Sequence, residues 1–263
     1  LGLPFEAVIL NRRKDGATYW ARIESKPLRD EFGRINRFMA VQRDITAQKR
    51  TEARLDLHHA VVQLLSDASE IGGLLPSLLK LIGNYLGWPV GVAWEVKGKR
   101  WVGDVNMRSA ALWSSNELRY AGFLAATEKA AWHKGEGFLG GVWQSKQLTF
   151  VHDLHSVRDH LRGVQADKEG LQGALVLPIL SGERVTFLLE FTGPRMDPPD
   201  AELLQFLEGV CIQVSRFIDR KRDEMRLRQF MTEFDSLFKL SPDGFVVFNS
   251  EGIRSYGNPA FYT

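Results

Sequence analysis

The chain has 263 residues, of which 44% are hydrophobic and 25% charged, proportions typical of an ordinary soluble domain protein. Its formal net charge of +2 leaves no strong overall field for nucleic acid or a membrane surface, and its single cysteine excludes an internal disulfide framework and a cysteine-built zinc site. The apolar runs are far shorter than the roughly 20 residues that span a bilayer. We therefore expect a reducing, cytoplasmic setting with no membrane contact by this segment.

Residues 5–45 alternate like an antiparallel meander. Turn residues at Lys14-Asp15-Gly16 and at Phe32-Gly33 separate three strand-like runs. The pattern changes at Asp44-Ile45-Thr46, where helix formers begin, and Thr46 or Asp44 is placed to cap the first backbone N–H groups.

The helix that follows places one stripe of residues at alternating four- and three-residue spacing, which suits a coiled-coil seam or a bundle. The stripe consists of Thr51, Leu55, His58, Val62 and Leu65. After Gly72-Gly73 a second, shorter helix is expected to run to about Tyr85 and to end at Gly87.

Residues 90–195 mix short strands and helices. In chain order we predict a hairpin around Lys97-Gly98, a helix over 116–129, a glycine-rich loop over 135–143, a strand over 148–153, a helix over 156–170 and a hairpin around Ser181-Gly182. The layout indicates an α+β core.

A long final helix is expected from Pro199-Asp200. Leu203, Leu207, Val210, Val214 and Phe217 share one face of it at four-three spacing. A run of mixed charges follows, which we interpret as a solvated helix face. The last residues, 241–263, predict a turn, a strand, a second turn and another strand. Because a lone hairpin is marginal in water, we expect more protein after them.

Both ends of the chain resemble parts of PAS domains. KDGATYWARIESKPLRDEFGRINRFMAVQRDIT (14–46) is similar to the C-terminal half of that family, in which Asp44-Ile45-Thr46 matches the exit from the sheet into a signalling helix. FDSLFKLSPDGFVVFNSEGIRSYGNPAFYT (234–263) is similar to the first half.

The middle, from about residue 55 to 220, resembles a GAF domain. The stretch GEGFLGGVWQSKQLTFVHDL (135–154) carries the resemblance, supported by GALVLPILSGERVTFLLEF (173–191). The sequence departs from the family pattern at Gly141 and Leu148, which does not affect the expected fold.

These resemblances imply an α+β fold: a GAF-like antiparallel sheet with flanking long helices, preceded by a partial PAS β-meander and followed by the start of a second PAS domain. The expected boundaries are 1–46 for the first PAS piece, 47–70 for a signalling helix, 71–220 for the GAF domain, 221–235 for a helical linker and 236–263 for the second PAS piece. We expect an excerpt of a bacterial signalling protein, in which such arrays precede a histidine kinase or a cyclic-di-GMP-synthesising domain.

The residues supply no catalytic constellation. The glycines of 135–141 lack the Gly-Lys-Ser/Thr of a phosphate-binding loop, so a structural loop over the pocket is favoured. His152, Asp153, His155 and His160 are the only metal-like cluster; they straddle a strand end and a turn, and we predict no metal site. Cys211, in the final helix and followed by Ile212, is expected to be a small core residue rather than a bilin attachment site. No cofactor is indicated.

Aromatic residues suggest where a ligand would bind, because ligand pockets are mostly apolar with a few polar groups. On the strand VTFLLEF, Val185 and Phe187 share one face with Leu189, while Thr186 and Glu190 share the other and would look into a pocket or solvent. The alternative is that the rings simply fill the core. The candidate ligand-binding residues are Trp94, Trp113, Phe123, Trp132, Phe138, Trp143, Thr186 and Glu190.

We therefore predict a sensory and signal-relay segment without catalytic activity. It would bind a small molecule or relay conformational change through a homodimer to an output domain in the same polypeptide. The predicted helix seam comprises Leu55, Val62, Leu65, Leu207, Val210, Val214 and Phe217. Two rivals remain open: a ligand-free dimerisation or spacer module, and an enzyme that reduces methionine sulfoxide, which would need reactive cysteines.

Overall fold

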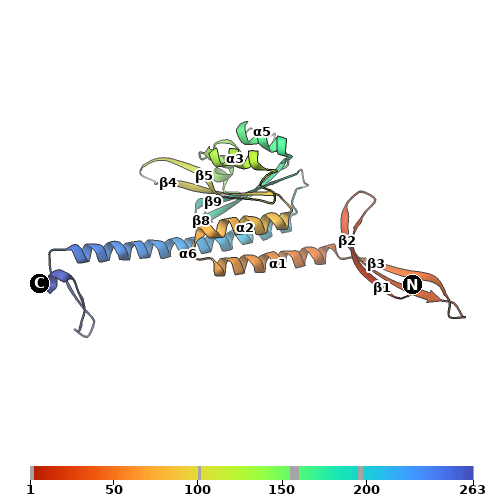
Figure 1. Ribbon diagram of the computed structural model, residues 1–263, viewed down its shortest axis with the longest axis horizontal. Coiled ribbons are helices and arrows are strands. Elements are labelled where there is room, and N and C mark those ends of the chain that lie inside the picture. The colour runs from red at the N-terminus through yellow and green to blue at the C-terminus, as the bar shows by residue number, and fades with distance from the viewer. Residues whose placement is uncertain (1–2, 100–101, 155–159, 195–197, 263) are drawn as a thin grey trace.

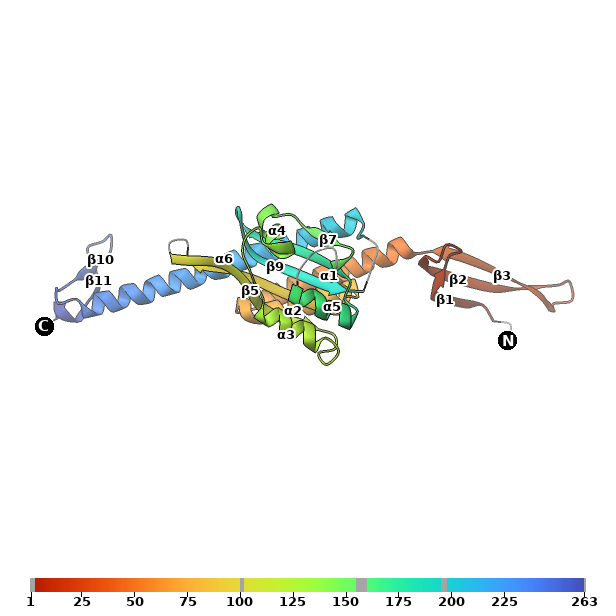
Figure 2. The ribbon, with the colours of Figure 1, turned by 90° about the horizontal axis from the view of Figure 1, so that it is seen from above.

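The computed structural model describes residues 3–99, 102–154, 160–194 and 198–262. The molecule is elongated, with a central α+β domain between a three-stranded sheet at its N-terminal end and a small hairpin at its C-terminal end (Figure 1). Seen from above, the two terminal pieces lie at opposite ends of the long axis (Figure 2). Both hydrophobic cores of the described residues lie in the central domain and the helices packed against it.

The N-terminal sheet is the predicted meander. Its strands are antiparallel in the order β1-β2-β3, with Gly16 and Gly33 at positive φ in the two connecting turns. The strands are β1 (Phe5–Arg12), β2 (Thr18–Arg29) and β3 (Ile35–Asp44). Register places Phe5, Ile9 and Phe38 on one face, and all three are exposed, so the sheet has an uncovered apolar side.

The next two helices run against the central domain. They are α1 (Thr46–Asp67) and α2 (Ile71–Leu86). Helix α2 ends as predicted at Gly87, which adopts the left-handed conformation that glycine reaches without steric cost.

The central sheet is antiparallel, in the order β6-β5-β4-β9-β8-β7. Its strands are β4 (Val90–Lys99), β5 (Val102–Ser114), β6 (Ala131–Trp132), β7 (Thr149–Val151), β8 (Gly173–Ser181) and β9 (Arg184–Gly193). The two predicted hairpins are β4–β5 and β8–β9, which pair with each other through β4 and β9.

Three short helices, α3 (Ala121–Lys129), α4 (Gly137–Ser145) and α5 (His160–Glu169), lie on the other side of the sheet from α1, α2 and α6 (Figure 1). Helix α3 begins later than predicted, because Asn116 accepts a hydrogen bond from the Arg119 N–H in a preceding turn. The described part of the predicted 156–170 helix is α5.

The glycine-rich loop predicted over 135–143 is wrong, because most of it forms helix α4. A Cβ at position 140 would lie 2.2 Å from the His133 carbonyl oxygen. Glycine is therefore needed here for close approach of two backbone segments, not for a flexible loop.

Helix α6 (Ala201–Leu240) is 40 residues long and starts where predicted, with the Asp200 carboxylate accepting from the Leu203 N–H at 2.7 Å. It passes under the sheet and continues beyond the central domain to the C-terminal hairpin (Figures 1 and 2). That piece comprises β10 (Val246–Phe248), β11 (Arg254–Gly257) and a 3₁₀ turn (Pro259–Phe261).

Asn258 holds the C-terminal hairpin on the end of α6. It is fully buried; its amide donates to the Phe238 and Asp243 carbonyls, and its side-chain oxygen accepts from the Phe245 and Phe261 N–H groups. One side chain therefore satisfies four backbone groups.

Candidate ligand pocket and interaction surfaces

The central sheet separates two apolar cores. The first, between the sheet and helices α1, α2 and α6, contains Leu78, Leu79, Ile82, Phe187, Leu189, Phe191, Val210 and Val214, among others. The second, between the sheet and helices α3, α4 and α5, contains Val92, Trp94, Phe123, Trp132, Leu139, Trp143, Ala166 and Leu188, among others. The ligand pocket suggested by the sequence would lie on the second side.

A small cavity of about 20 Å³ lies in this second core, large enough for roughly one water molecule. It is lined by Phe123, Trp132, Phe138, Leu139, Leu154, Arg162, Gly163, Ala166 and Glu190. Aromatic walls surround one acidic and one basic group.

Glu190 on β9 and Arg162 on α5 form a buried ion pair. The Arg162 guanidinium donates to the Glu190 carboxylate at 2.7 Å, and the Trp94 indole N–H donates to the same oxygen at 2.8 Å. The Arg162 side chain is 6% exposed and that of Glu190 1%, so the pair is shielded from water and each charge is stabilised by the other.

Aromatic rings enclose the same guanidinium. Its carbon lies 4.9 Å from a ring centroid of Trp94 and 4.7 Å from that of Phe123, within the range of cation–π attraction. Its Nε donates to the Thr127 hydroxyl at 3.0 Å, and that hydroxyl donates to the Phe123 carbonyl at 2.7 Å. The cationic head is thus held on several sides.

A second carboxylate ties α5 to α3. Glu169 accepts from the backbone N–H groups of Gly122 at 2.9 Å and Phe123 at 3.2 Å, in the first turn of α3. A carboxylate at a helix N-terminus satisfies donors that the helix leaves unpaired.

Within the described part of the chain, Trp132, which lines the cavity, has an unpaired donor. Its side chain is 8% exposed, and its indole nitrogen has no hydrogen-bond partner among the described residues. Buried donors are normally paired, so this one is a notable feature of the pocket wall.

The predicted ligand residues divide between the two cores. Trp94, Phe123, Trp132, Phe138, Trp143 and Glu190 lie on the α3–α5 side. Trp113 does not: it packs into the other core, where its ring covers Gly83 of α2. Thr186 is half-buried and donates to the Ile179 carbonyl at 3.2 Å.

A bulge changes the expected face of Val185. The register shifts between Ile179, which pairs with Phe187, and Leu180, which pairs with Val185. Val185 therefore joins the core of Leu188 instead of the face of Phe187. Arg162 and Thr127 were not among the predicted site residues. The available signal was the i, i+4 spacing of Arg162 and Ala166, the buried positions of an otherwise polar helix.

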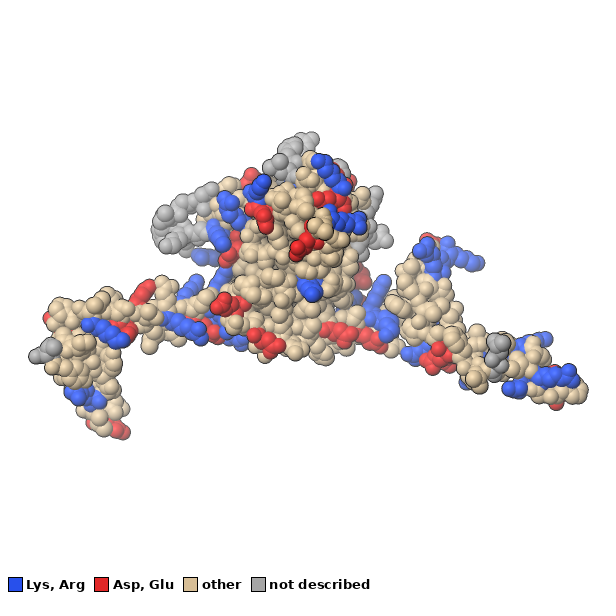
Figure 3. Space-filling model, viewed as in Figure 1, with Lys and Arg blue, Asp and Glu red and all other residues tan. Residues whose placement is uncertain are grey.

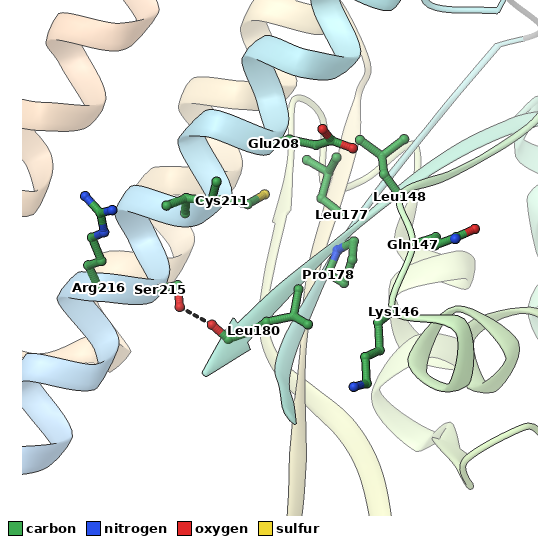
Figure 4. A pocket seen from close by; sticks show the side chains of 11 residues that line it. Lys146, Gln147, Leu148, Leu177, Pro178, Leu180, Glu208, Cys211, Ser215 and Arg216 are labelled. Carbon is green, nitrogen blue, oxygen red and sulfur yellow. Dashed lines mark hydrogen bonds between the residues drawn. The ribbon is translucent and has the colours of Figure 1, made fainter. Parts of the chain in front are cut away.

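A larger groove of about 690 Å³ lies on the opposite side of the sheet, between α6, β8 and the segment after α4 (Figure 4). Glu208, Cys211 and Ser215 approach it from α6, with Leu177 and Pro178 across from them on β8 (Figure 4). The Ser215 hydroxyl donates to the Leu180 carbonyl and closes one end. Burial raises the pKa of the Cys211 thiol to about 12, which disfavours its thiolate.

Four of the predicted seam residues are internal. Leu207, Val210, Val214 and Phe217 are buried in the core beneath the sheet, so they hold α6 on its own domain and cannot form a seam between copies. Leu65 is partly buried in the same core, whereas Leu55 and Val62 on α1 are exposed.

A different apolar stripe is exposed on α6 beyond the domain. Its four residues follow at three-four-three spacing and each is more than half exposed. They are Leu227, Phe230, Phe234 and Leu237. We call this set the distal stripe.

Comparison with protein families identifies the central domain. The model of the GAF domain matches residues 68–219, more than half of the chain. The chain belongs to the GAF domain family. A search of curated proteins gives no match.

Solved structures agree with this fold at low sequence identity. The GAF domain of a phosphoenolpyruvate-protein phosphotransferase from Coxiella burnetii has a TM-score of 0.53 at 16% identity, covering 66% of this chain and 98% of that one. The corresponding domain from Acinetobacter has a TM-score of 0.51 at 14% identity, with 66% and 97% covered. Each of these likenesses shows the fold alone.

A third similar structure corrects one prediction. Free methionine-R-sulfoxide reductase from Neisseria meningitidis, in complex with its substrate, has a TM-score of 0.50 at 15% identity, covering 66% of this chain and 93% of that one. The expectation of a chain without catalytic activity is overturned by this comparison, because the fold also serves an enzyme. Membership of the GAF family does not argue against catalysis.

Two further observations concern the described residues. No group of three or more His, Cys, Asp or Glu side chains among them is arranged to hold a metal ion; His155 of the metal-like cluster lies outside these ranges. In the same part of the chain, no helix combines the length and apolar character that crossing a bilayer requires.

Proposed function

We propose that this chain is a sensory and signal-relay segment. Its GAF domain would bind a small ligand or pass on conformational change, and α1 and α6 would carry that change through a homodimer to an output domain outside the chain. The observation that carries the proposal is the continuity of α6 from the GAF core to the distal stripe (Figure 1). The proposed setting is cytoplasmic.

The input side is coupled just as directly. The Trp20 N–H donates to the Thr46 hydroxyl at 2.9 Å, the Ile45 N–H donates to the Trp20 carbonyl at 2.8 Å, and Asp44 accepts from the Thr46 N–H at 2.9 Å. The first turn of α1 is therefore fastened to the central strand of the meander. This arrangement supports the assignment of residues 1–46 as a PAS piece at the input end of the relay, and residues 236–263 are proposed as the second PAS piece.

Helix α1 is in turn joined to the start of α6. The Arg54 guanidinium lies 2.8 Å from a carboxylate oxygen of Glu202 and 3.3 Å from one of Asp200, the residue that caps α6. Hydrogen bonding to Glu202 raises the pKa of Arg54 above its ordinary value. Movement of α1 along its axis would strain these contacts.

Charges on the visible face fit a helical interface better than a nucleic-acid surface. Basic and acidic side chains are intermixed along the helices at the base of the domain (Figure 3). Flanking positions of both signs are typical of helices that pair with a copy of themselves.

The alternative is a ligand-free dimerisation or spacer module. The small size of the cavity, about 20 Å³, is the observation that favours it, because the aromatic side chains and Arg162 fill most of the space. Glu190 buried against the cavity favours sensing, because a buried ion pair is often no more stabilising than well-packed hydrophobic residues of similar volume.

Disulfide crosslinking tests the relay. Cys211 is buried, so a cysteine engineered at Leu227→Cys or Leu237→Cys is the reactive thiol of its variant. A parallel seam brings equivalent positions together, so each variant should form a covalent dimer on oxidation. Thr232→Cys, midway between them on the opposite face of the helix, is the matched control and should not. Equal crosslinking at 232, or none at 227 and 237, would contradict the proposal.

A further inference from the structure

The Arg162 side chain occupies the GAF pocket as a ligand would. Its guanidinium lies over the rings of Trp94 and Phe123, pairs with the Glu190 carboxylate and donates to the Thr127 hydroxyl. Two aromatic walls and a buried carboxylate form a site for an organic cation. We call Trp94, Phe123, Thr127 and Glu190 the cage.

The cage combines two layers: Trp94 and Glu190 lie in the sheet, whereas Phe123 and Thr127 lie on α3. Trp94 and Glu190 belong to neighbouring strands at the centre of the sheet, where Val92 pairs with Glu190 and Trp94 pairs with Leu188. The occupant comes from α5, an outer helix that is connected to α3 by Glu169. Among residues 162–169, only Arg162 and Ala166 are buried, so α5 has a small apolar footing.

The negative charge of Glu190 determines which charge a molecule must carry to replace Arg162. Glu190 is 1% exposed, and an unpaired carboxylate at that depth is costly. A molecule that displaces Arg162 must therefore bring a positive charge. A planar guanidinium stacks on aromatic rings and retains the hydrogen bonds to Glu190 and Thr127, which a spherical ammonium reproduces less well.

The unused donor of Trp132 adds a second requirement. Trp132 lines the same cavity, and its indole N–H lacks a partner among the described residues. A carboxylate or carbonyl oxygen on the incoming molecule would satisfy it. The remaining space of about 20 Å³ is too small for a molecule to bind beside Arg162, so binding requires exchange.

We infer that the cage recognises a small guanidino compound carrying an acceptor oxygen, and that this compound binds by displacing the Arg162 side chain. Displacement removes the ion pair that holds α5 to the sheet and leaves α5 connected to α3 through Glu169. The inference rests on the sensing part of the proposed function and names its ligand class. Because Arg162 is a tethered competitor, the free protein is held in the unliganded arrangement.

The probe for the test is L-arginine, which carries both groups, with butylguanidinium as the probe that lacks the acceptor oxygen. Binding to the full chain is measured by calorimetry and by tryptophan fluorescence. We expect wild type to bind L-arginine, and Arg162→Ala to bind it at least ten-fold more tightly because the competitor is gone. Adding Glu190→Gln to Arg162→Ala should weaken binding at least ten-fold. Butylguanidinium should bind more weakly than L-arginine, and L-lysine more weakly again.

Each alternative result decides the inference. A folded Arg162→Ala variant with no gain in affinity for L-arginine, or binding that is unchanged by Glu190→Gln, would overturn it. If Arg162→Ala is unfolded, millimolar L-arginine should restore its circular dichroism while equal sodium chloride should not; failure of that rescue would also overturn it. Failure here with crosslinking at Leu227→Cys and Leu237→Cys would refute the ligand class and leave the relay standing. The converse result would refute the relay alone.

Discussion

Gly83 of α2 lies directly against the indole of Trp113, and adding one carbon there should destabilise the protein. A Cβ at position 83 would lie 2.1 Å from Cζ3 of Trp113, with two more ring atoms within 2.9 Å. Overpacking of this kind costs about 1–3 kcal/mol. Because three ring atoms are involved, we expect the upper end of that range. Replacing glycine by alanine inside a helix stabilises the folded state by about 1 kcal/mol. Gly83→Ala should therefore lower the free energy of unfolding by about 2 kcal/mol overall.

Gly209 provides a matched control. It also lies inside a helix, α6, but no atom lies within 4 Å of its added Cβ. Gly209→Ala should therefore gain up to about 1 kcal/mol from helix propensity alone. Urea unfolding followed by circular dichroism measures both free energies of unfolding. In a Trp113→Leu background, Gly83→Ala should lose most of its cost, since the clash is removed.

A Gly83→Ala variant as stable as wild type, or more stable, would refute the predicted clash with Trp113. The clash would also be refuted if the cost were unchanged after truncation of Trp113, because the loss would then come from somewhere other than this contact.

Three further predictions concern single side chains. Asn258→Ala should raise amide exchange in the β10–β11 hairpin at least ten-fold, because buried backbone groups lose their partner at about 1–3 kcal/mol each; Asn249→Ala, in the exposed turn, should change it far less. Hydrogen bonds from Thr46, together with the charge of Arg13, hold the pKa of Asp44 below its ordinary value. Its contribution to helix α1 is therefore present above about pH 4 and is lost as the pH falls through the lowered value; acid titration of helicity should show this loss in wild type and not in Asp44→Asn. With a pKa of about 12, Cys211 is thiolate at a fraction on the order of 10⁻⁴ at pH 8, so a thiol reagent should label native protein at least a hundred-fold more slowly than urea-unfolded protein, and equal rates would contradict its burial.

Local sequence patterns predicted the elements that have strong local signals. The β8–β9 hairpin follows from two apolar runs around Ser181-Gly182, and the start of α6 from an aspartate after a proline-rich stop. Helix α4 escaped prediction because its glycines indicate a loop when read locally. Their reason is a close backbone approach, such that a Cβ added at position 140 would lie 2.2 Å from the His133 carbonyl oxygen, and this approach exists only in the folded chain.

The pocket shows the same division. Period-two alternation placed Glu190 opposite Phe187, but alternation cannot detect the bulge that moves Val185 to the other core. The role of Arg162 could not be predicted from local sequence, because its partners on β9 and α3 are at least 28 residues away along the chain. The apolar spacing of α6 was read correctly as a stripe, but sequence spacing alone does not distinguish a stripe facing its own sheet from one facing a second copy.

From Val210 to Leu240, α6 contains neither glycine nor proline. A helix of 40 residues spans about 60 Å at 1.5 Å per residue, and each residue turns it by about 100°. The direction in which the chain leaves α6 at Ser241 therefore depends on the length of the helix. One inserted residue rotates that direction by about 100° about the helix axis, whereas seven inserted residues return it to nearly the same direction about 10 Å farther along the axis. The number of residues between the GAF core and the hairpin acts as an angular setting, independent of which side chains they carry.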